Sequence, residues 1–182
     1  MLKRGNFGPS VRTLQKKLNR LHFKVGRGLA TGYFGWKTDD AVRRLQCAYG
    51  LKLDGLVGPK TKAALAENGQ LSPNFHVDEF CSKGNGDLKL NGELIMRLER
   101  LRKELKSPIH ITSGYRDSWY NRKVGGARNS MHLQGRAADI TSPNRSVVEM
   151  AVAADKVGFN GIGKYHRQGF VHVDVRGWRA RW

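Results

Sequence analysis

The sequence predicts two folded parts of different class: a small all-α three-helix domain, followed by an α+β domain with an antiparallel sheet. Three observations predict this. The first 67 residues show helical periodicity, residues 67–75 are rich in Gly, Ser and Pro, and the remainder alternates short strand patterns with helical ones. We therefore assign one domain to residues 1–69 and a second to residues 75–182, which a chain of 182 residues can accommodate.

The first domain contains an internal repeat of helical patterns. The segments VRTLQKKLNRL and AVRRLQCAYGL each space their apolar residues three and four positions apart: Val11, Leu14, Leu18 and Leu21, then Ala41, Val42, Leu45 and Ala48. Ser10 is expected to cap the first helix and Gly50 to end the second. A third helix is expected to begin at Pro59, because proline suits the first helical position.

The landmarks of this repeat resemble those of the peptidoglycan-binding domain type 1. Each L-Q pair is followed by a glycine-rich loop and a threonine, in GYFGWKT and then in DGLVGPKT. The resemblance covers about the first 67 residues. It implies a three-helix module that anchors the chain to the bacterial cell wall.

The second domain begins with a helix and continues with strands. NGELIMRLERLRKELK places Leu94, Leu98, Leu101 and Leu105 on one helical face, and it ends before Pro108. IHITSGY and RAADIT are typical of short strands, and RSVVEMAVAADKVGF is typical of a helix. GIGKY and GFVHVDV predict a closing antiparallel hairpin.

The composition is strongly basic. Lys and Arg number 33 against 15 Asp and Glu, a formal net charge of +18. A field of this sign attracts polyanions, so anionic envelope polymers are expected as secondary partners. The sequence contains no nucleic-acid-binding motif, and nucleic acid is therefore not expected as a partner.

The cysteines and the N-terminal segment indicate where in the cell the protein is made. Cys47 and Cys81 make no disulfide framework and no C-x-x-C pair, so both are expected to be free thiols. MLKRGNFGPSVRTLQ lacks the apolar core of a signal peptide, and no apolar run reaches membrane-spanning length. We expect a monomer that is made in the cytoplasm, does not insert stably into membranes, and acts on the wall after release.

Three side chains are candidate ligands for a metal ion. His132 lies in a Gly-flanked loop, Asp139 lies seven positions further at the end of a predicted strand, and His172 lies mid-strand in FVHVDV. A catalytic zinc site takes three such ligands and keeps a fourth position open. Alternation along the last strand places Phe170, His172 and Asp174 on one face.

The sequence around these residues resembles the zinc D-alanyl-D-alanine carboxypeptidase family. That family also includes vancomycin-resistance D,D-dipeptidases and phage L-alanyl-D-glutamate endopeptidases. The S-x-H-x-x-G-x-A-x-D signature is complete from Ser130 to Asp139, and the resemblance extends over about residues 75–182. It implies Zn²⁺ held by His132, Asp139 and His172. It also implies that Arg116, in SGYR, binds a substrate carboxylate or the developing oxyanion, with Ser130 contributing to substrate binding.

At the positions where relatives carry the general base, this sequence differs from the family. Relatives carry Glu three residues before the last zinc histidine, or His two residues before it, where this chain has Gly169 and Phe170. Two candidates are left. Asp174 could take the proton of the water or could orient a zinc histidine, and His166 lies in the predicted hairpin turn. The sequence leaves this choice open.

The two domains together predict a peptidoglycan hydrolase of the phage endolysin type, a zinc peptidase that cleaves stem or cross-link peptides. One alternative is a D-alanyl-D-alanine carboxypeptidase that trims stem peptides. Another is a non-catalytic basic protein that binds the cell wall. A lysozyme is a third, and it would need two positioned carboxylates.

Overall fold

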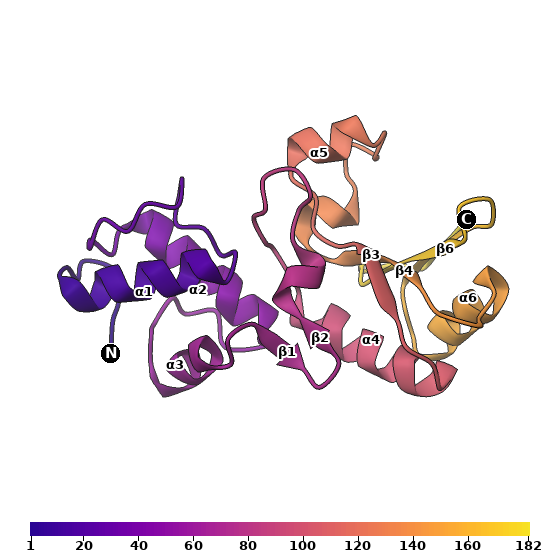
Figure 1. Ribbon diagram of the computed structural model, residues 1–182, viewed down its shortest axis with the longest axis horizontal. Helices are drawn as coiled ribbons and strands as arrows, with labels where there is room; N and C mark the ends of the chain where they lie inside the picture. Colours follow the sequence, from indigo (N-terminus) through magenta and orange to yellow (C-terminus); the bar gives the residue numbers. More distant parts are fainter.

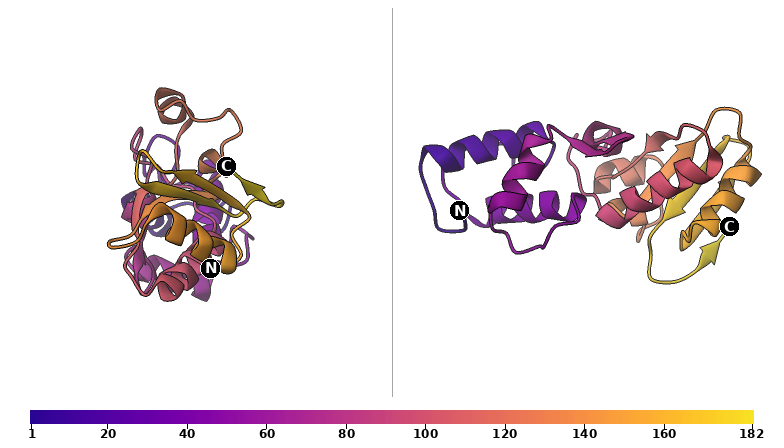
Figure 2. Two further views of the ribbon diagram at one scale, coloured as in Figure 1. Left: turned by 90° about the vertical axis from the view of Figure 1, so that its right-hand side faces the viewer. Right: turned by 90° about the horizontal axis from the view of Figure 1, so that it is seen from below.

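The computed structural model describes residues 1–182 and has an elongated shape (Figure 1). The three N-terminal helices lie at one end, and a five-stranded sheet with its covering helices lies at the other (Figures 1 and 2). The predicted fold class, α+β after a three-helix part, is confirmed. None of the helices has both the length and the apolar character needed to cross a membrane.

The N-terminal part consists of α1 (Pro9–Arg20), α2 (Trp36–Ala48) and α3 (Pro59–Ala66). The prediction that Ser10 caps α1 is wrong. Gly8 is the cap residue and Pro9 the first helical residue, because the fixed φ of proline and its missing N–H suit that position. Gly50 follows α2 with a φ of 62°, and α3 begins at Pro59, so both of these predictions are confirmed.

The sequence repeat corresponds to a repeated hydrogen-bond arrangement. Gln15 of α1 is buried, and its side-chain amide donates to Thr38 Oγ1 in the first turn of α2 at 2.9 Å. Gln46 of α2 donates in the same way to Thr61 Oγ1 of α3 at 3.2 Å. The carbonyl oxygen of each glutamine accepts a loop glycine N–H, from Gly32 and from Gly55. Each L-Q pair thus fastens its helix to the loop and helix that follow.

A short antiparallel pair of strands connects the two parts. β1 (Gln70–Ser72) lies in the segment expected to be a linker, residues 67–75, and β2 (Phe75–His76) begins at its last residue. The 3₁₀ helix η1 (Val77–Phe80) follows. α4 (Gly92–Leu105) then begins after Asn91, whose side chain accepts from the N–H of Glu93. The predicted leucine face of α4 is confirmed as buried.

The C-terminal part is built on a sheet with the strand order β3-β4-β6-β5-β7. Its strands are β3 (His110–Ser113), β4 (Ala137–Thr141), β5 (Gly161–Tyr165), β6 (Phe170–Asp174) and β7 (Ala180–Arg181). All neighbours are antiparallel except β5 and β7. α4 and α6 (Val147–Lys156) lie on one side of the sheet, and α5 (Ser118–Lys123) rises on the other (Figure 1). The 3₁₀ helix η2 (Met131–Gln134) joins α5 to β4.

The two parts pack directly against each other. Their buried apolar residues form one continuous core. Arg44 of α2 donates to Asp87 at 2.8 Å and to the carbonyl of Leu88 at 2.9 Å. The N–H of Leu88 in turn donates to the carbonyl of His22 at 3.0 Å. The N-terminal helices are therefore a packed part of the molecule.

Candidate metal centre

The sheet register brings two of the predicted ligands together. Asp139 on β4 lies directly opposite His172 on β6. Asp139 is in the middle of β4, whereas the sequence predicted it at the end of a strand. His132 lies on η2, and the side chain of Ser130 caps that turn by accepting from the N–H of His132 at 3.3 Å. All three side chains are buried.

The three ligand atoms form a small triangle. His132 Nε2 lies 3.2 Å from Asp139 Oδ1 and 3.1 Å from His172 Nδ1, and His172 Nδ1 lies 3.0 Å from Asp139 Oδ1. In tetrahedral zinc sites with nitrogen and oxygen at about 2.0–2.2 Å, neighbouring ligands lie roughly 3.3 Å apart. The side chains are therefore spaced as zinc requires.

The outer contacts of the two histidines determine where their protons lie. His132 Nδ1 is 2.6 Å from the carbonyl of Gly114, which can only accept, so Nδ1 carries a proton. His172 Nε2 is 3.0 Å from Asp174 Oδ2, which likewise fixes a proton on Nε2. The nitrogens that face Asp139 are therefore the basic ones in the neutral rings. Two lone pairs and a carboxylate then meet at one point, which requires a shared cation, either one added proton or a metal ion.

Burial and neighbouring charge act differently on these groups. Burial lowers the pKa of His132 below its ordinary value. Burial also acts to lower the pKa of His172, but Asp139 and Asp174 outweigh it and raise that pKa. Burial acts to raise the pKa of Asp139, and the two histidines outweigh it, so that this pKa is held well below its usual range. Asp139 is thus ionised and available as a metal ligand.

Arg116 contacts the cluster, whereas the sequence predicted for it only a contact with substrate. One terminal nitrogen of its guanidinium contacts Asp139 Oδ2, and its Nε donates to Ser113 Oγ at 2.9 Å. Arg116 therefore holds the oxygen of Asp139 that faces away from the histidines. Its side chain also lines the cleft above the cluster.

The two candidates for the general base lie in different surroundings. Asp174 is fully buried behind His172, and Arg176 donates to it from Nε at 2.8 Å. Burial acts to raise the pKa of Asp174, but His172 and Arg176 lower it by more, so the carboxylate is ionised and fully paired. His166 is exposed in the turn between β5 and β6 and does not line the cleft.

Two features of the site were missed by the sequence reasoning. The Trp182 ring lies 5.2 Å from the His172 ring, and Arg176 lies over the Trp182 ring at 5.1 Å. Trp182 crosses β5 at Gly163, where a Cβ would come within 2.5 Å of the indole. The aromatic and basic segment GWRARW was the sequence feature that could have indicated these contacts, but the sequence alone did not place it beside His172.

A cleft of about 750 Å³ opens above the cluster. One wall comes from Val124–Gly126 and Ser130 at the α5 side, and the other from Tyr165, Phe170 and Trp182. Tyr165 and Phe170 stack with their ring centres 4.4 Å apart, which stiffens that wall. A buried, zinc-compatible cluster at the base of an open cleft is an arrangement suited to metal-assisted hydrolysis.

Comparison with known proteins assigns the family. The peptidase M15 family model matches residues 73–174, more than half of the chain. The chain belongs to the peptidase M15 family. The model for a peptidoglycan binding domain matches residues 7–65 of this M15 protein. Together with the buried His132, Asp139 and His172 cluster, membership of this family makes the chain a zinc metallopeptidase similar to zinc D-Ala-D-Ala carboxypeptidase.

Individual relatives are similar to nearly the whole chain or to part of it. A zinc D-Ala-D-Ala carboxypeptidase of Streptomyces albus G is 32% identical over 200 residues, covering 98% of this M15 protein and 78% of the relative. A probable N-acetylmuramoyl-L-alanine amidase of Bacillus licheniformis is 42% identical over 62 residues, which is 32% of this chain and 18% of the amidase. The crystal structure of the SleB N-terminal domain matches at 41% identity with a TM-score of 0.34, covering 36% of this chain and 88% of that domain.

Proposed function

We propose that this chain is a peptidoglycan hydrolase that cuts stem or cross-link peptides of the bacterial cell wall. One observation carries the proposal: a buried zinc-type cluster at the base of an open cleft lies in the same chain as a peptidoglycan binding domain. The cluster supplies the chemistry of amide hydrolysis, and the binding domain supplies contact with the polymer. Neither part alone would indicate this substrate.

We assign the zinc to His132, Asp139 and His172, with the two histidines binding through Nε2 and Nδ1 respectively. The proton positions set by Gly114 and Asp174 support this assignment. Bound zinc lowers the pKa of a water towards ~7 and polarises the scissile carbonyl.

Arg116 is proposed to bind a substrate carboxylate or the charge that develops on the carbonyl oxygen. Its guanidinium lines the cleft while two of its nitrogens are held by Ser113 and Asp139. A planar, fixed guanidinium can stabilise such charge with little reorganisation. Ser130 also lines the cleft, so a contact with substrate is compatible with its capping of η2.

Asp174 is proposed to position His172 rather than to take the proton of the water. Its carboxylate is buried, is paired with Arg176, and contacts the ring nitrogen that faces away from the cluster. The exposed location of His166 gives that histidine no contact with the cleft. We propose a carboxylate of the substrate as the acceptor of that proton.

Cleavage of terminal D-Ala is the second candidate function. The relative from Streptomyces albus G is described as a D-Ala-D-Ala carboxypeptidase, and the similarity covers nearly the whole chain. Mass spectrometry of fragments from purified peptidoglycan separates the two. Shortened cross-links and split stem peptides support an endopeptidase, whereas free D-Ala with intact cross-links supports a carboxypeptidase. Fragments with new reducing ends and no new amines would contradict both.

We further propose that the chain acts as a lysis enzyme of the phage endolysin type, released to the wall after synthesis in the cytoplasm. The pairing of one binding module with one peptidase module supports this, as does a charge of +18 that favours approach to anionic envelopes. The purified protein added to outer-membrane-permeabilised bacteria should reduce the turbidity of the suspension. Unchanged turbidity, with active hydrolysis of isolated wall, would contradict the lytic role alone.

A further inference from the structure

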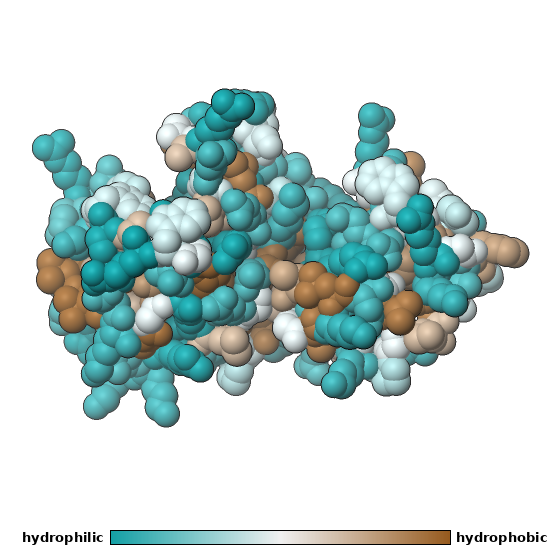
Figure 3. Space-filling model, turned by 180° about the vertical axis from the view of Figure 1, so that it is seen from behind, coloured by the Kyte–Doolittle hydropathy of each residue, from teal (hydrophilic) through white to brown (hydrophobic).

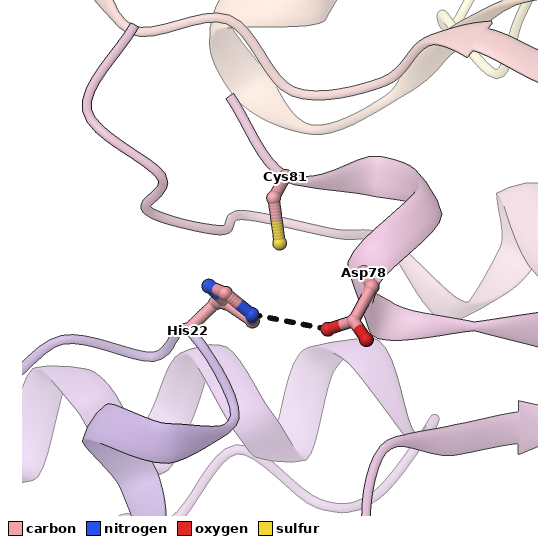
Figure 4. Close-up of side chains that lie close together, drawn as sticks. All are labelled: His22, Asp78 and Cys81. Carbon is pink, nitrogen blue, oxygen red and sulfur yellow. Dashed lines mark ion pairs between the residues drawn. The ribbon is translucent and has the colours of Figure 1, made fainter. Parts of the chain in front are cut away.

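A second cluster of metal-ligand residues lies between the two parts of the molecule. It consists of His22, which follows α1, together with Asp78 in η1 and Cys81 directly after η1 (Figure 4). One ligand atom from each side chain lies within 4.8 Å of the others. Figure 4 shows the three side chains pointing toward one another. These residues are remote in sequence from the His132 cluster and play no part in it.

The backbone and ring of His22 are both fixed. Its φ is 65°, in the left-handed region that non-glycine residues seldom adopt. Nδ1 of its ring is 2.9 Å from the carbonyl of Gly86, so Nδ1 donates and the neutral ring presents a lone pair on Nε2. That nitrogen lies 3.0 Å from Asp78 Oδ1. Two acceptors therefore face each other, and a proton or a metal ion must lie between them.

The sulfur of Cys81 completes the donor set. Cys81 is half-buried, and its thiol donates to the carbonyl of Val77 at 3.3 Å. Burial, together with Asp78 and Asp87, raises the pKa of this thiol to about 12, so the sulfur keeps its proton when no metal is bound. Coordination to a transition metal removes that proton outright, because a bound thiol ligates as the thiolate. The surrounding carboxylates would then face a cation.

We propose that His22, Asp78 and Cys81 form a second site for a divalent transition metal of the zinc class. One imidazole, one carboxylate and one thiolate suit zinc or cobalt, and the sulfur disfavours calcium and magnesium. Around a zinc ion, nitrogen and sulfur ligand atoms lie roughly 3.5 Å from one another. The ligand atoms of His22, Asp78 and Cys81 lie within 4.8 Å of one another, so the longest of these distances must shorten by about 1 Å when the metal binds. Asp78 is well exposed, which leaves room for water as the fourth ligand.

The site would fasten the segment after α1 to η1, and so one part of the molecule to the other. Nearby contacts already join the segment after α1 to residues 87 and 88, which follow η1: the N–H of Lys24 donates to Asp87 at 3.2 Å, and the N–H of Leu88 donates to the carbonyl of His22 at 3.0 Å. A metal ion there would stabilise the folded arrangement by mass action, since the unfolded chain does not preform the site. Metal binding at His22, Asp78 and Cys81 does not depend on which substrate the peptidase cleaves.

Cobalt titration of the full-length protein tests the proposal, because only one of the two clusters contains sulfur. After chelator treatment, Co²⁺ should bind at two equivalents per chain and give a thiolate-to-cobalt charge-transfer band in the near ultraviolet. Cys81→Ser should lose the band and one equivalent. His22→Asn, a residue type that tolerates positive φ, should do the same. His132→Ala should lose one equivalent and keep the band.

Cys47→Ser is the matched control, since Cys47 is the second free thiol and lies outside the cluster. It should retain both equivalents and the band. Binding of a single equivalent without a charge-transfer band in the unsubstituted protein would overturn the proposal. A band that survives in Cys81→Ser would overturn it as well.

Discussion

At the scale of single residues, the site depends on proton positions fixed from outside the cluster. The carbonyl of Gly114 fixes the tautomer of His132, and Asp174 fixes that of His172. His172 and Arg176 both pair with Asp174 and keep its carboxylate ionised inside the protein. Such outer contacts orient metal ligands and raise their basicity. The role of Asp174 is therefore open to a direct test.

Asp174→Asn should weaken zinc affinity by roughly 10–100-fold, because the amide preserves the shape but loses the charge that holds His172. Saturating zinc should restore most of the turnover. A general base at this position would instead lower turnover by about 10²–10⁴ even at saturating zinc. The measurement is the rate of muropeptide hydrolysis against zinc concentration. His166→Ala serves as the control and should leave that rate unchanged, since His166 is exposed in a turn.

At the scale of elements, the η2 turn carries His132 and is held by a close backbone crossing. Gly135 has a φ of 68°, and a Cβ there would lie 2.2 Å from the carbonyl oxygen of Lys89. The carbonyl of Gly135 accepts the N–H of Asn91, directly before α4. The glycine in the S-x-H-x-x-G-x-A-x-D signature thus allows η2 to pack against the chain that leads into α4.

Gly135→Ala should destabilise the fold and release zinc together. The left-handed backbone alone costs an alanine about 1–2 kcal/mol, and the clash with Lys89 adds to it by displacing η2. Urea unfolding and zinc content measure the two effects. Gly177→Ala is the control, because a Cβ there meets nothing within 4 Å, and its stability should stay within about 0.5 kcal/mol of the parent. Normal stability and zinc content in Gly135→Ala would contradict this account of η2.

The elements predicted from periodicity formed as expected, because their patterns are local. The leucine face of α4 and the β5–β6 hairpin needed only spacing and turn residues. The start of α1 was predicted wrongly, because Pro9 takes the first helical position and Ser10 lies inside the helix. The strand β1 was not predicted, because it depends on pairing with β2. In the site, the signature identified His132 and Asp139, and the wider family resemblance added His172; the structure brings the three side chains together.

The contacts around those ligands could not be predicted from the sequence. The carbonyl of Gly114 carries no side-chain signal, and the packing of Trp182 on His172 requires β7 to lie beside β5. The His22, Asp78 and Cys81 cluster joins segments that only the tertiary fold brings together. These features depend on contacts between distant segments rather than on local pattern.

At the scale of the whole molecule, a continuous core joins a wall-binding part to a peptidase part, and both carry the basic charge. Hydrophilic residues cover much of the face seen in Figure 3, at both ends of the molecule. On the N-terminal part, the aromatic side chains of Trp36 and Tyr33 are 65% and 56% exposed. Together with Leu29 they border a hollow of about 310 Å³.

The charge of +18 should accelerate attack on whole envelopes. The Debye length falls from ~10 Å at 0.1 M salt to ~3 Å at 1 M, so attraction to anionic polymers fades across that range. Hydrolysis of whole envelopes should fall more steeply with salt than hydrolysis of a small neutral peptide. Parallel salt curves for the two substrates would show that the charge does not assist approach.

Trp36→Ala should weaken binding to isolated sacculi and leave hydrolysis of soluble muropeptides unchanged. Its ring is exposed beside the hollow on the binding domain, and Trp36 does not line the cleft of the peptidase. Co-sedimentation with sacculi gives the binding, and amine release gives the rate. Met96→Ala, at a similarly exposed position on α4, is the control and should change neither. Unaltered sedimentation of Trp36→Ala would remove this residue from the wall-binding surface.

If the buried cluster carries out peptide hydrolysis in peptidoglycan, His132→Ala should abolish that hydrolysis. This substitution removes a zinc ligand from the base of the cleft while Asp139 and His172 stay in the sheet. The measurement is the rate of new amine release from purified peptidoglycan by the parent protein and by His132→Ala, each with zinc added after chelation. We expect full recovery in the parent and no detectable release by the variant, with unchanged circular dichroism. Amine release by a folded, chelator-treated His132→Ala at the parent's rate would contradict it.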